Sequence, residues 1–175
     1  METFVTETRQ WNRNEVAELL VASNALTDLT RDAARQIVEL LTLDHVAAGT
    51  ILIEEGVTST GFMALILEGA AIVANSGEDA AGEPVVLGEV GPGAVIGELG
   101  ILDGKPRSAT VTAVTDMDIA VLDRAALGRL IDTLPSVGCS LLSAIMVRIS
   151  ERLRATNLRV QELAAENKRL KEAAA

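Results

Sequence analysis

Glycine is concentrated in one part of this 175-residue chain, and that distribution constrains the fold more than any other feature. Twelve of the 14 glycines lie between Gly49 and Gly104. They separate short runs rich in β-branched and other apolar residues, a pattern typical of strands joined by tight turns. Many short strands with glycine turns indicate a small antiparallel β-roll or jelly-roll barrel. The runs span residues 50–53, 62–67, 70–73, 85–87, 109–114 and 118–122.

Helical patterns precede this region. Apolar residues recur at helical spacing between residues 15 and 43, which predicts two short helices. Thr30 is a suitable N-cap for the second of them. The only histidine, His45, is expected in a surface connector, and the polar segment 75–83 is expected at a hairpin tip.

Helices are also expected after the strands. Asp123 is a good N-cap for a helix over residues 124–134, and Pro135 would end that helix and open another. The fold class is therefore α+β, with a flanked β-roll domain over residues 15–134. A long C-terminal helix is predicted over residues 135–175.

The C-terminal helix carries an apolar heptad repeat that lasts for more than four heptads. Such a repeat is typical of the seam of a left-handed two-stranded coiled coil, and a lone Asn at position a, here Asn167, favours a parallel pair. We expect a homodimer through residues 139–170; the alternative is a single helix lying on its own barrel. The a positions are Cys139, Met146, Leu153, Val160 and Asn167, and the d positions are Leu142, Ile149, Thr156, Leu163 and Leu170.

Charge and composition narrow the classes of function. The net charge is −10, although the chain from Arg148 onward holds seven Lys or Arg against four Asp or Glu. The acidic part of the chain before Arg148 is repelled by nucleic acid. The basic segment from Arg148 onward is interpreted as a solvated helix face rather than a nucleic-acid arm. One cysteine excludes an internal disulfide, and no apolar run reaches the roughly 18 residues of a membrane span. We therefore expect a cytoplasmic protein without membrane partners.

Catalysis is not expected. A metal-dependent jelly-roll enzyme needs two or three histidines near a carboxylate, and His45 is the only histidine. No Ser-His or Cys-His nucleophile pair is evident. The sequence predicts neither an enzyme nor a cofactor.

Residues 95–111 place a carboxylate, a short helical turn and a guanidinium between two apolar strands. Gly97 allows a close backbone approach to a ligand, and the turn beginning at Glu98 offers free N–H groups to an anion. Arg107 supplies paired donors that suit a phosphate, whereas Glu98 can accept from a sugar hydroxyl. These side chains suit a sugar phosphate; the alternative is a simple salt bridge between Glu98 and Arg107 on a turn.

Several strings in order resemble the cyclic nucleotide-binding domain family. GEL at 97–99 followed by PRSATV at 106–111 resembles the phosphate-binding cassette of that family. VAAGTILIEEG at 46–56 resembles its first barrel strand, and LILEG at 65–69 its barrel glycine motif. The resemblance covers residues 26–170 and implies a β-roll that binds a cyclic nucleotide.

The resemblance implies a role for each residue of the cassette. Glu98 would hold the ribose 2′-hydroxyl, with backbone contributions from Gly97 and Leu99. Arg107 would neutralise the cyclic phosphate, and Ser108 would add a hydroxyl to it.

Residues outside the cassette would complete the pocket. Leu87 would line its wall. RLRATN at 152–157 is similar to the Arg-Leu-x-x-Thr-Ser string with which bacterial catabolite activator proteins reach the base, so Thr156 and Asn157 would face the base. The alternative is that Thr156 is simply a tolerated residue in the helical seam.

These motifs predict a cyclic-nucleotide receptor that signals through its C-terminal helix. Ser108 does not supply the threonine often linked to cGMP preference in the family, so cAMP is favoured over cGMP. The turn at 57–61 departs from the family pattern, because it lacks the usual acidic residue and aromatic pair. Two alternatives stay open. One is a ligand-free homodimeric scaffold on the same fold, in which the pairing of Glu98 with Arg107 is accidental. The other is the sensor half of a transcription regulator, because no helix-turn-helix is evident after the predicted dimer helix. The sequence does not identify a downstream effector.

Overall fold

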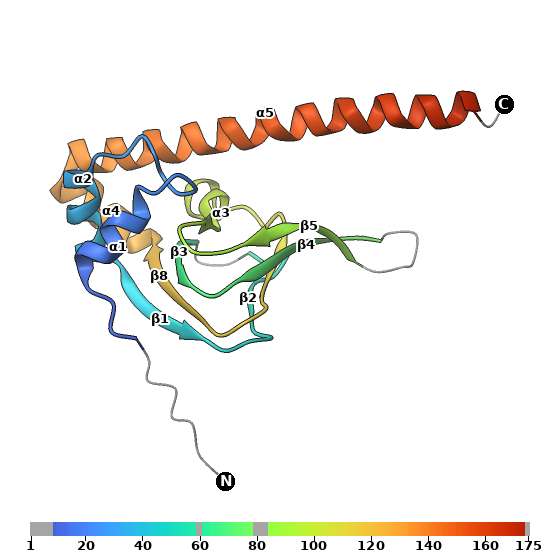
Figure 1. Ribbon diagram of the computed structural model, residues 1–175. Coiled ribbons are helices and arrows are strands. Elements are labelled where there is room, and N and C mark those ends of the chain that lie inside the picture. Colours follow the sequence, from blue (N-terminus) through green and yellow to red (C-terminus); the bar gives the residue numbers. More distant parts are fainter. Residues whose placement is uncertain (1–8, 59–60, 79–83, 174–175) are drawn as a thin grey trace, which may run out of the picture.

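A computed structural model describes residues 9–58, 61–78 and 84–173. A β-roll is covered at one end by helices, and a long helix runs past the roll and continues beyond it (Figure 1). The helices are α1 (Arg13–Leu20), α2 (Arg31–Ile37), the 3-10 helix η1 (Val38–Leu40), α3 (Glu98–Asp103), α4 (Arg124–Thr133) and α5 (Pro135–Ala173). The strands are β1 (Thr42–Val46), β2 (Ile51–Ile53), β3 (Phe62–Glu68), β4 (Ala71–Glu78), β5 (Pro84–Val90), β6 (Val95–Ile96), β7 (Thr110–Ala113) and β8 (Met117–Asp123).

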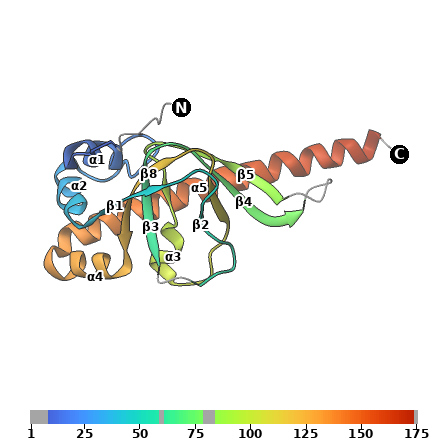
Figure 2. The same ribbon diagram turned by 90° about the horizontal axis from the view of Figure 1, so that it is seen from below.

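Within the described residues the strands form two four-stranded sheets, in the orders β1-β8-β3-β6 and β2-β7-β4-β5. Every neighbouring pair is antiparallel. The predicted α+β class with an antiparallel jelly-roll is confirmed. The β4–β5 hairpin projects from the roll in the same direction as α5 (Figure 2).

Strand β3 separates two hydrophobic cores. Successive side chains of a strand point to opposite faces, so alternate residues of β3 enter different cores. Met63 and Leu65 pack with the helices, whereas Ala64 and Ile66 pack between the two sheets. Because both faces are covered, the central strand reads as a continuous apolar run, as β3 does.

The expected helix caps are confirmed. The Thr30 hydroxyl accepts from the N–H of Ala33 at 3.2 Å, and Asp123 Oδ1 accepts from the N–H of Ala126 at 2.6 Å. Helix α5 begins at Pro135, as predicted. No helix among the described residues is both long and apolar enough to cross a membrane.

One sequence expectation was wrong, and another needs a correction of its bounds. His45 lies in strand β1 rather than in a connector, and its Nδ1 is 2.8 Å from Asp118 Oδ1 on β8. The hairpin expected around segment 75–83 is formed by β4 and β5, but β4 extends to Glu78 because its polar residues pair with the start of β5. Residues 79–83 lie outside the described residues, as do residues 59 and 60 of the atypical 57–61 turn.

Candidate functional site

Gly97 sets the entrance to α3 in a conformation that favours glycine. Its φ is +77°, in the left-handed region. A Cβ there would lie 2.8 Å from the Phe62 carbonyl oxygen and 3.1 Å from Ile53 Cδ1. The chain therefore turns tightly against β3 before Glu98, the first residue of α3.

Arg107 is buried beneath that turn, with 6% of its surface exposed. Its Nη1 donates to the Gly97 carbonyl at 2.8 Å and to the Phe62 carbonyl at 3.2 Å, and Nη2 also donates to Phe62 at 3.2 Å. The guanidinium lies over the Phe62 ring, 4.6 Å from its centroid. Burial lowers the pKa of Arg107, and the nearby charge of Glu98 opposes that shift. A guanidinium stays charged under such conditions.

Gly100, which sequence reasoning missed, makes room for Arg107. A Cβ at Gly100 would lie 2.2 Å from Arg107 Nη1 and 2.7 Å from Cζ. The guanidinium thus packs directly on the backbone of α3. The only available signal was a glycine inside a helical turn, which alone has many explanations.

Glu98 is 3% exposed, so its carboxylate is held away from water. Arg152, from α5, brings Nη1 within 2.6 Å of Glu98 Oε1. The approach is a charge–charge contact without hydrogen-bond geometry, and within the described part of the chain Oε1 has no hydrogen-bond donor. The charge of this buried carboxylate is paired with Arg152, and its Oε1 retains the capacity to accept a hydrogen bond from a hydroxyl.

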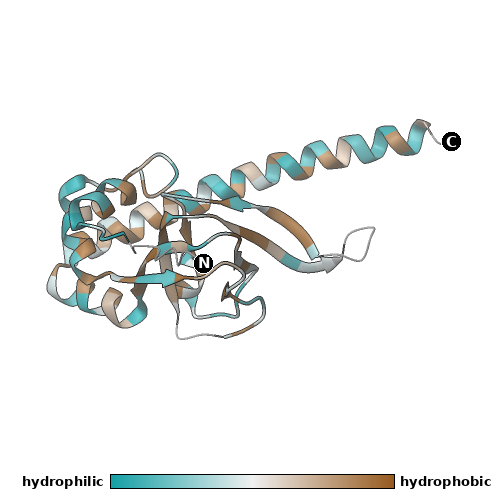
Figure 3. Ribbon diagram, turned by 60° about the horizontal axis from the view of Figure 1, so that its bottom comes forward, coloured by the Kyte–Doolittle hydropathy of each residue, from teal (hydrophilic) through white to brown (hydrophobic). Residues whose placement is uncertain are grey.

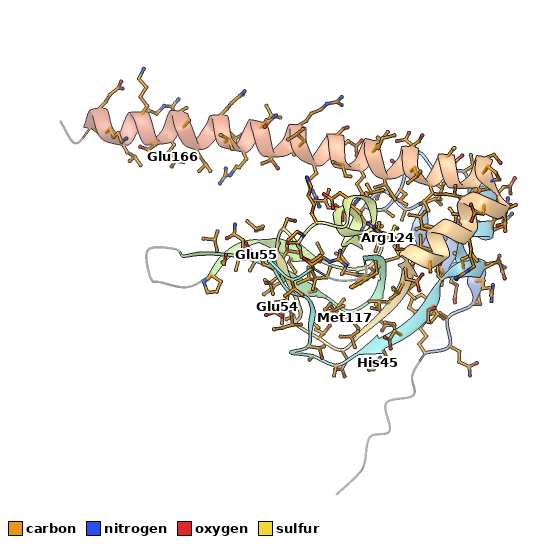
Figure 4. The ribbon with its side chains drawn as sticks, turned by 180° about the vertical axis from the view of Figure 1, so that it is seen from behind. His45, Glu54, Glu55, Met117, Arg124 and Glu166 are labelled. Carbon is orange, nitrogen blue, oxygen red and sulfur yellow. The ribbon has the colours of Figure 1, made fainter. Side chains whose placement is uncertain are left out.

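Arg124 supports the other end of α3 and was also missed by sequence reasoning. It is the first residue of α4, and Nη2 donates to the carbonyls of Gly100 and Ile101 at 3.2 and 3.0 Å. Figure 4 places the labelled Arg124 next to α3. These bonds satisfy carbonyls at the end of α3 and join α3 to α4.

The structure brings only part of the predicted site together. Gly97, Glu98, Leu99 and Arg107 form one cluster, in which Leu99 is half-buried. Ser108 follows Arg107 in the chain and is exposed.

Three other predicted residues are exposed rather than part of this buried cluster. Leu87 on β5 is 57% exposed, and Thr156 and Asn157 are exposed on α5. The Thr156 hydroxyl donates to the Arg152 carbonyl at 2.8 Å, which satisfies it within its own helix.

The cluster combines a buried acceptor, a buried cation and a tight glycine turn. Such a set can hold a ligand that carries a negative group and a neighbouring hydroxyl, because the cation attracts the first and the carboxylate accepts from the second. Helix α5 contributes Arg152 to the same place, where it contacts Glu98.

Comparisons with known proteins agree with this chemistry. The profile of the family described as "Cyclic nucleotide-binding domain" matches residues 43–133, which is 91 of the 175 residues. A cAMP-dependent protein kinase regulatory subunit of Yarrowia lipolytica is 33% identical over 106 residues, covering 61% of this chain and 27% of that protein. A lysophospholipase of Candida albicans is 32% identical over 106 residues, covering 57% of this chain and 8% of that protein.

A solved structure matches over a larger share of both chains. It is a cyclic nucleotide-binding domain from Methylobacillus flagellatus, with a TM-score of 0.71 and 27% identity. The match covers 83% of this chain and 80% of that one. By contrast, the chain matches well under a third of the length of the two curated relatives.

Proposed function

Because this chain belongs to the cyclic nucleotide-binding domain family, we propose that it is a regulatory rather than catalytic receptor for a cyclic nucleotide, cAMP in preference to cGMP. The observation that carries the proposal is the buried Glu98 carboxylate beside the buried Arg107 guanidinium. Oε1 of Glu98 contacts Arg152 but accepts no hydrogen bond within the described residues. A cyclic nucleotide offers a ribose hydroxyl and one anionic phosphate, which match these groups in kind.

Each residue of the cassette has a role in this proposal. Glu98 accepts from the ribose 2′-hydroxyl, and the backbone of Gly97 and Leu99 lines the ligand. Arg107 pairs with the phosphate, and the exposed Ser108 hydroxyl donates to it.

The remaining predicted residues belong to the rim of the pocket. Leu87 forms the wall beside the base, while Thr156 and Asn157 reach the base from α5. The choice of cAMP is supported by Ser108 and by the likeness to a regulatory subunit that is named for cAMP.

Helix α5 has one face packed on the body and another that is available to a second copy, and the second face supports a homodimer. The face toward the body carries Val137, Leu141 and Ile145, all buried. Most of the heptad seam lies on a different face and is exposed, but Leu142 and Ile149 are half-buried and Ile149 packs against the main core. Beyond the body, apolar positions continue along the helix (Figure 3). Seam residues with large exposed side chains are Met146, Leu153, Val160, Leu163 and Leu170. A second copy of α5 in parallel would cover this seam and pair Asn167 with its counterpart.

Signalling, in this proposal, passes from α3 to α5. Leu134 alone separates α4 from α5 and is not helical, with φ −135° and ψ 66°. A ligand hydroxyl that donates to Glu98 competes with Arg152 for the same carboxylate, so α5 loses one contact with the body when the ligand displaces the arginine. Movement at Leu134 then repositions the dimer helix, provided that the ligand binds one helix position more tightly than the other.

In this proposal, ligand binding and output belong to the two parts of the chain that the sequence predicts. Residues 15–134 bind the ligand, and residues 135–175 form the dimer and output helix. The downstream effector would contact this helix.

Calorimetric titration with cAMP and cGMP tests the ligand site. We expect saturable binding by the wild type, loss of most affinity in Arg107→Ala, and a large loss in Glu98→Gln. Arg129→Ala, an exposed arginine on α4, is the matched control and should bind as the wild type does. Thermal unfolding of each variant identifies one that fails to fold. Equal binding by the wild type and Arg107→Ala would remove Arg107 from the site, and no binding of either nucleotide would favour the ligand-free scaffold.

Light scattering after size exclusion tests the dimer. Leu163→Lys lies in the seam and should give a monomer, because the charge would be buried between two helices. Leu158→Lys is the matched control, since Leu158 is 61% exposed and lies off the seam. A monomeric wild type, or a dimeric Leu163→Lys variant, would refute the seam.

A further inference from the structure

Helix α5 is held to the body by a series of contacts that ends at Arg152. Its buried residues run from Val137 to Ile145 on one face. Arg148 and then Arg152 continue that face, because residues four apart lie one above the other on a helix. All residues of α5 from Arg152 to Ala173 are exposed. The two arginines are therefore the last points at which the body fixes the helix.

Arg148 fastens α5 to the loop between α1 and α2. Its Nη1 donates to the Ala25 carbonyl at 3.0 Å and also to the Asn24 carbonyl. Burial lowers the pKa of Arg148 overall, and the negative charge of Glu98 opposes that shift. The loop is a firm support, because Ala25 and Leu26 are 3% and 1% exposed and belong to the main core.

Asn24 connects the same loop to the segment that leads into the site. Its Nδ2 donates to the Pro92 carbonyl at 2.6 Å. A Cβ at Gly93 would lie 2.4 Å from Asn24 Oδ1, so the amide packs directly on the glycine backbone. The turn that contains Pro92 and Gly93 precedes β6, which in turn leads into Gly97. Asn24 thus contacts the turn before β6 through its side chain and α5 through its backbone carbonyl.

We propose that Arg148 and Asn24 form a joint that holds α5 where Arg152 covers Glu98, and that this joint lowers the affinity for cyclic nucleotide without touching the ligand. The inference rests on the proposed function. A ligand whose site is open in only a fraction of molecules binds with an affinity reduced by that fraction. The joint keeps that fraction small, because it fixes the helix one turn before the ion pair. Arg148 is accordingly a positioning residue that acts through Arg152.

The substitution Arg148→Met tests the joint, because methionine keeps much of the apolar stem and removes the charge and the donors. We expect faster amide hydrogen exchange over residues 146–156 without ligand. We also expect cAMP to bind about threefold to tenfold more tightly, since a looser joint raises the fraction of molecules whose site is open. Asn24→Ala keeps the carbonyl that accepts from Arg148 and removes only the side-chain bond to Pro92, so it should shift both readouts in the same direction but by less. Arg154→Met, an exposed arginine on the same helix, is the control and should change neither.

A double-mutant cycle with Arg152→Met separates positioning from a general loosening of the protein. If Arg148 acts through Arg152, then adding Arg148→Met to the Arg152→Met variant should leave cAMP affinity unchanged. Unaltered exchange in Arg148→Met, weaker binding, or an equal gain in both backgrounds would each overturn the joint. A wild type that binds neither nucleotide would refute the proposed function and the effect on affinity together, and exchange would still show whether the joint holds the helix.

Discussion

Replacing Gly100 with alanine should displace Arg107 without altering any charged group. The added methyl would stand 2.2 Å from Arg107 Nη1, whereas non-bonded atoms prefer a separation of about 3.5 Å or more. The guanidinium must therefore retreat by about 1 Å. Its bonds to the Gly97 and Phe62 carbonyls, now 2.8 and 3.2 Å, would then pass out of range.

The cost follows from those bonds. A hydrogen bond from a charged donor contributes about 1.5–3 kcal/mol, and the helix gains about 1 kcal/mol when alanine replaces glycine. We expect a net loss of about 1–3 kcal/mol in the free energy of unfolding. The affinity for cAMP should fall about tenfold or more, because the phosphate partner is out of place.

Urea denaturation measures the first effect and calorimetric titration with cAMP the second. The matched control is Gly128→Ala on α4, where an added Cβ meets nothing within 4 Å. That variant should gain about 0.5–1 kcal/mol in stability and bind cAMP normally. If Gly100→Ala behaves like Gly128→Ala in both assays, then Arg107 does not depend on Gly100 and the reasoning is refuted.

Three further predictions concern other parts of the molecule. Asp123→Ala should lower the free energy of unfolding by about 1 kcal/mol through loss of the α4 cap, and an unchanged urea midpoint would contradict this. The pKa of His45 is raised, chiefly by its bond to Asp118, so this stabilisation is full below the ordinary value of 6.5 and is lost as the pH rises through the raised pKa. Burial would raise the pKa of Asp118, but bonds from His45 and Trp11 lower it overall, so its contribution is lost only in strong acid. The difference in melting temperature between the wild type and His45→Gln should therefore be larger at about pH 5.5 than at about pH 8.5, and equal differences would refute the pair. Oxidation should cross-link the homodimer through the exposed Cys139, whereas a Cys139→Ser variant should stay uncross-linked; a monomeric band for the oxidised wild type would count against a parallel seam at this position.

Local signals predicted most of the elements. The strands flanked by glycine turns, the Thr30 and Asp123 caps and the Pro135 boundary depend on neighbouring residues, and each is confirmed. Strand β1 escaped prediction because it is largely exposed at the edge of its sheet, so it lacks the apolar alternation that marks a strand. Its place depends on pairing with β8, far along the chain.

The site was predicted in part, for a related reason. Glu98 and Arg107 lie in one short segment, so their juxtaposition follows from local sequence. Arg152 reaches Glu98 from 54 positions away, and Arg124 reaches α3 by way of α4. Contacts of that kind depend on how helices pack across the roll, which periodicity alone does not specify.

The unbroken length of α5 makes it a lever. At 1.5 Å per residue, its 39 residues extend over about 58 Å from Leu134, the pivot proposed above. A tilt of about 10° at that pivot would sweep the tip by roughly 10 Å. Beyond Arg152 the arm presents its whole surface to solvent. Because Arg152 lies about 27 Å from Leu134, a displacement beside Glu98 would reach the tip about twice as large.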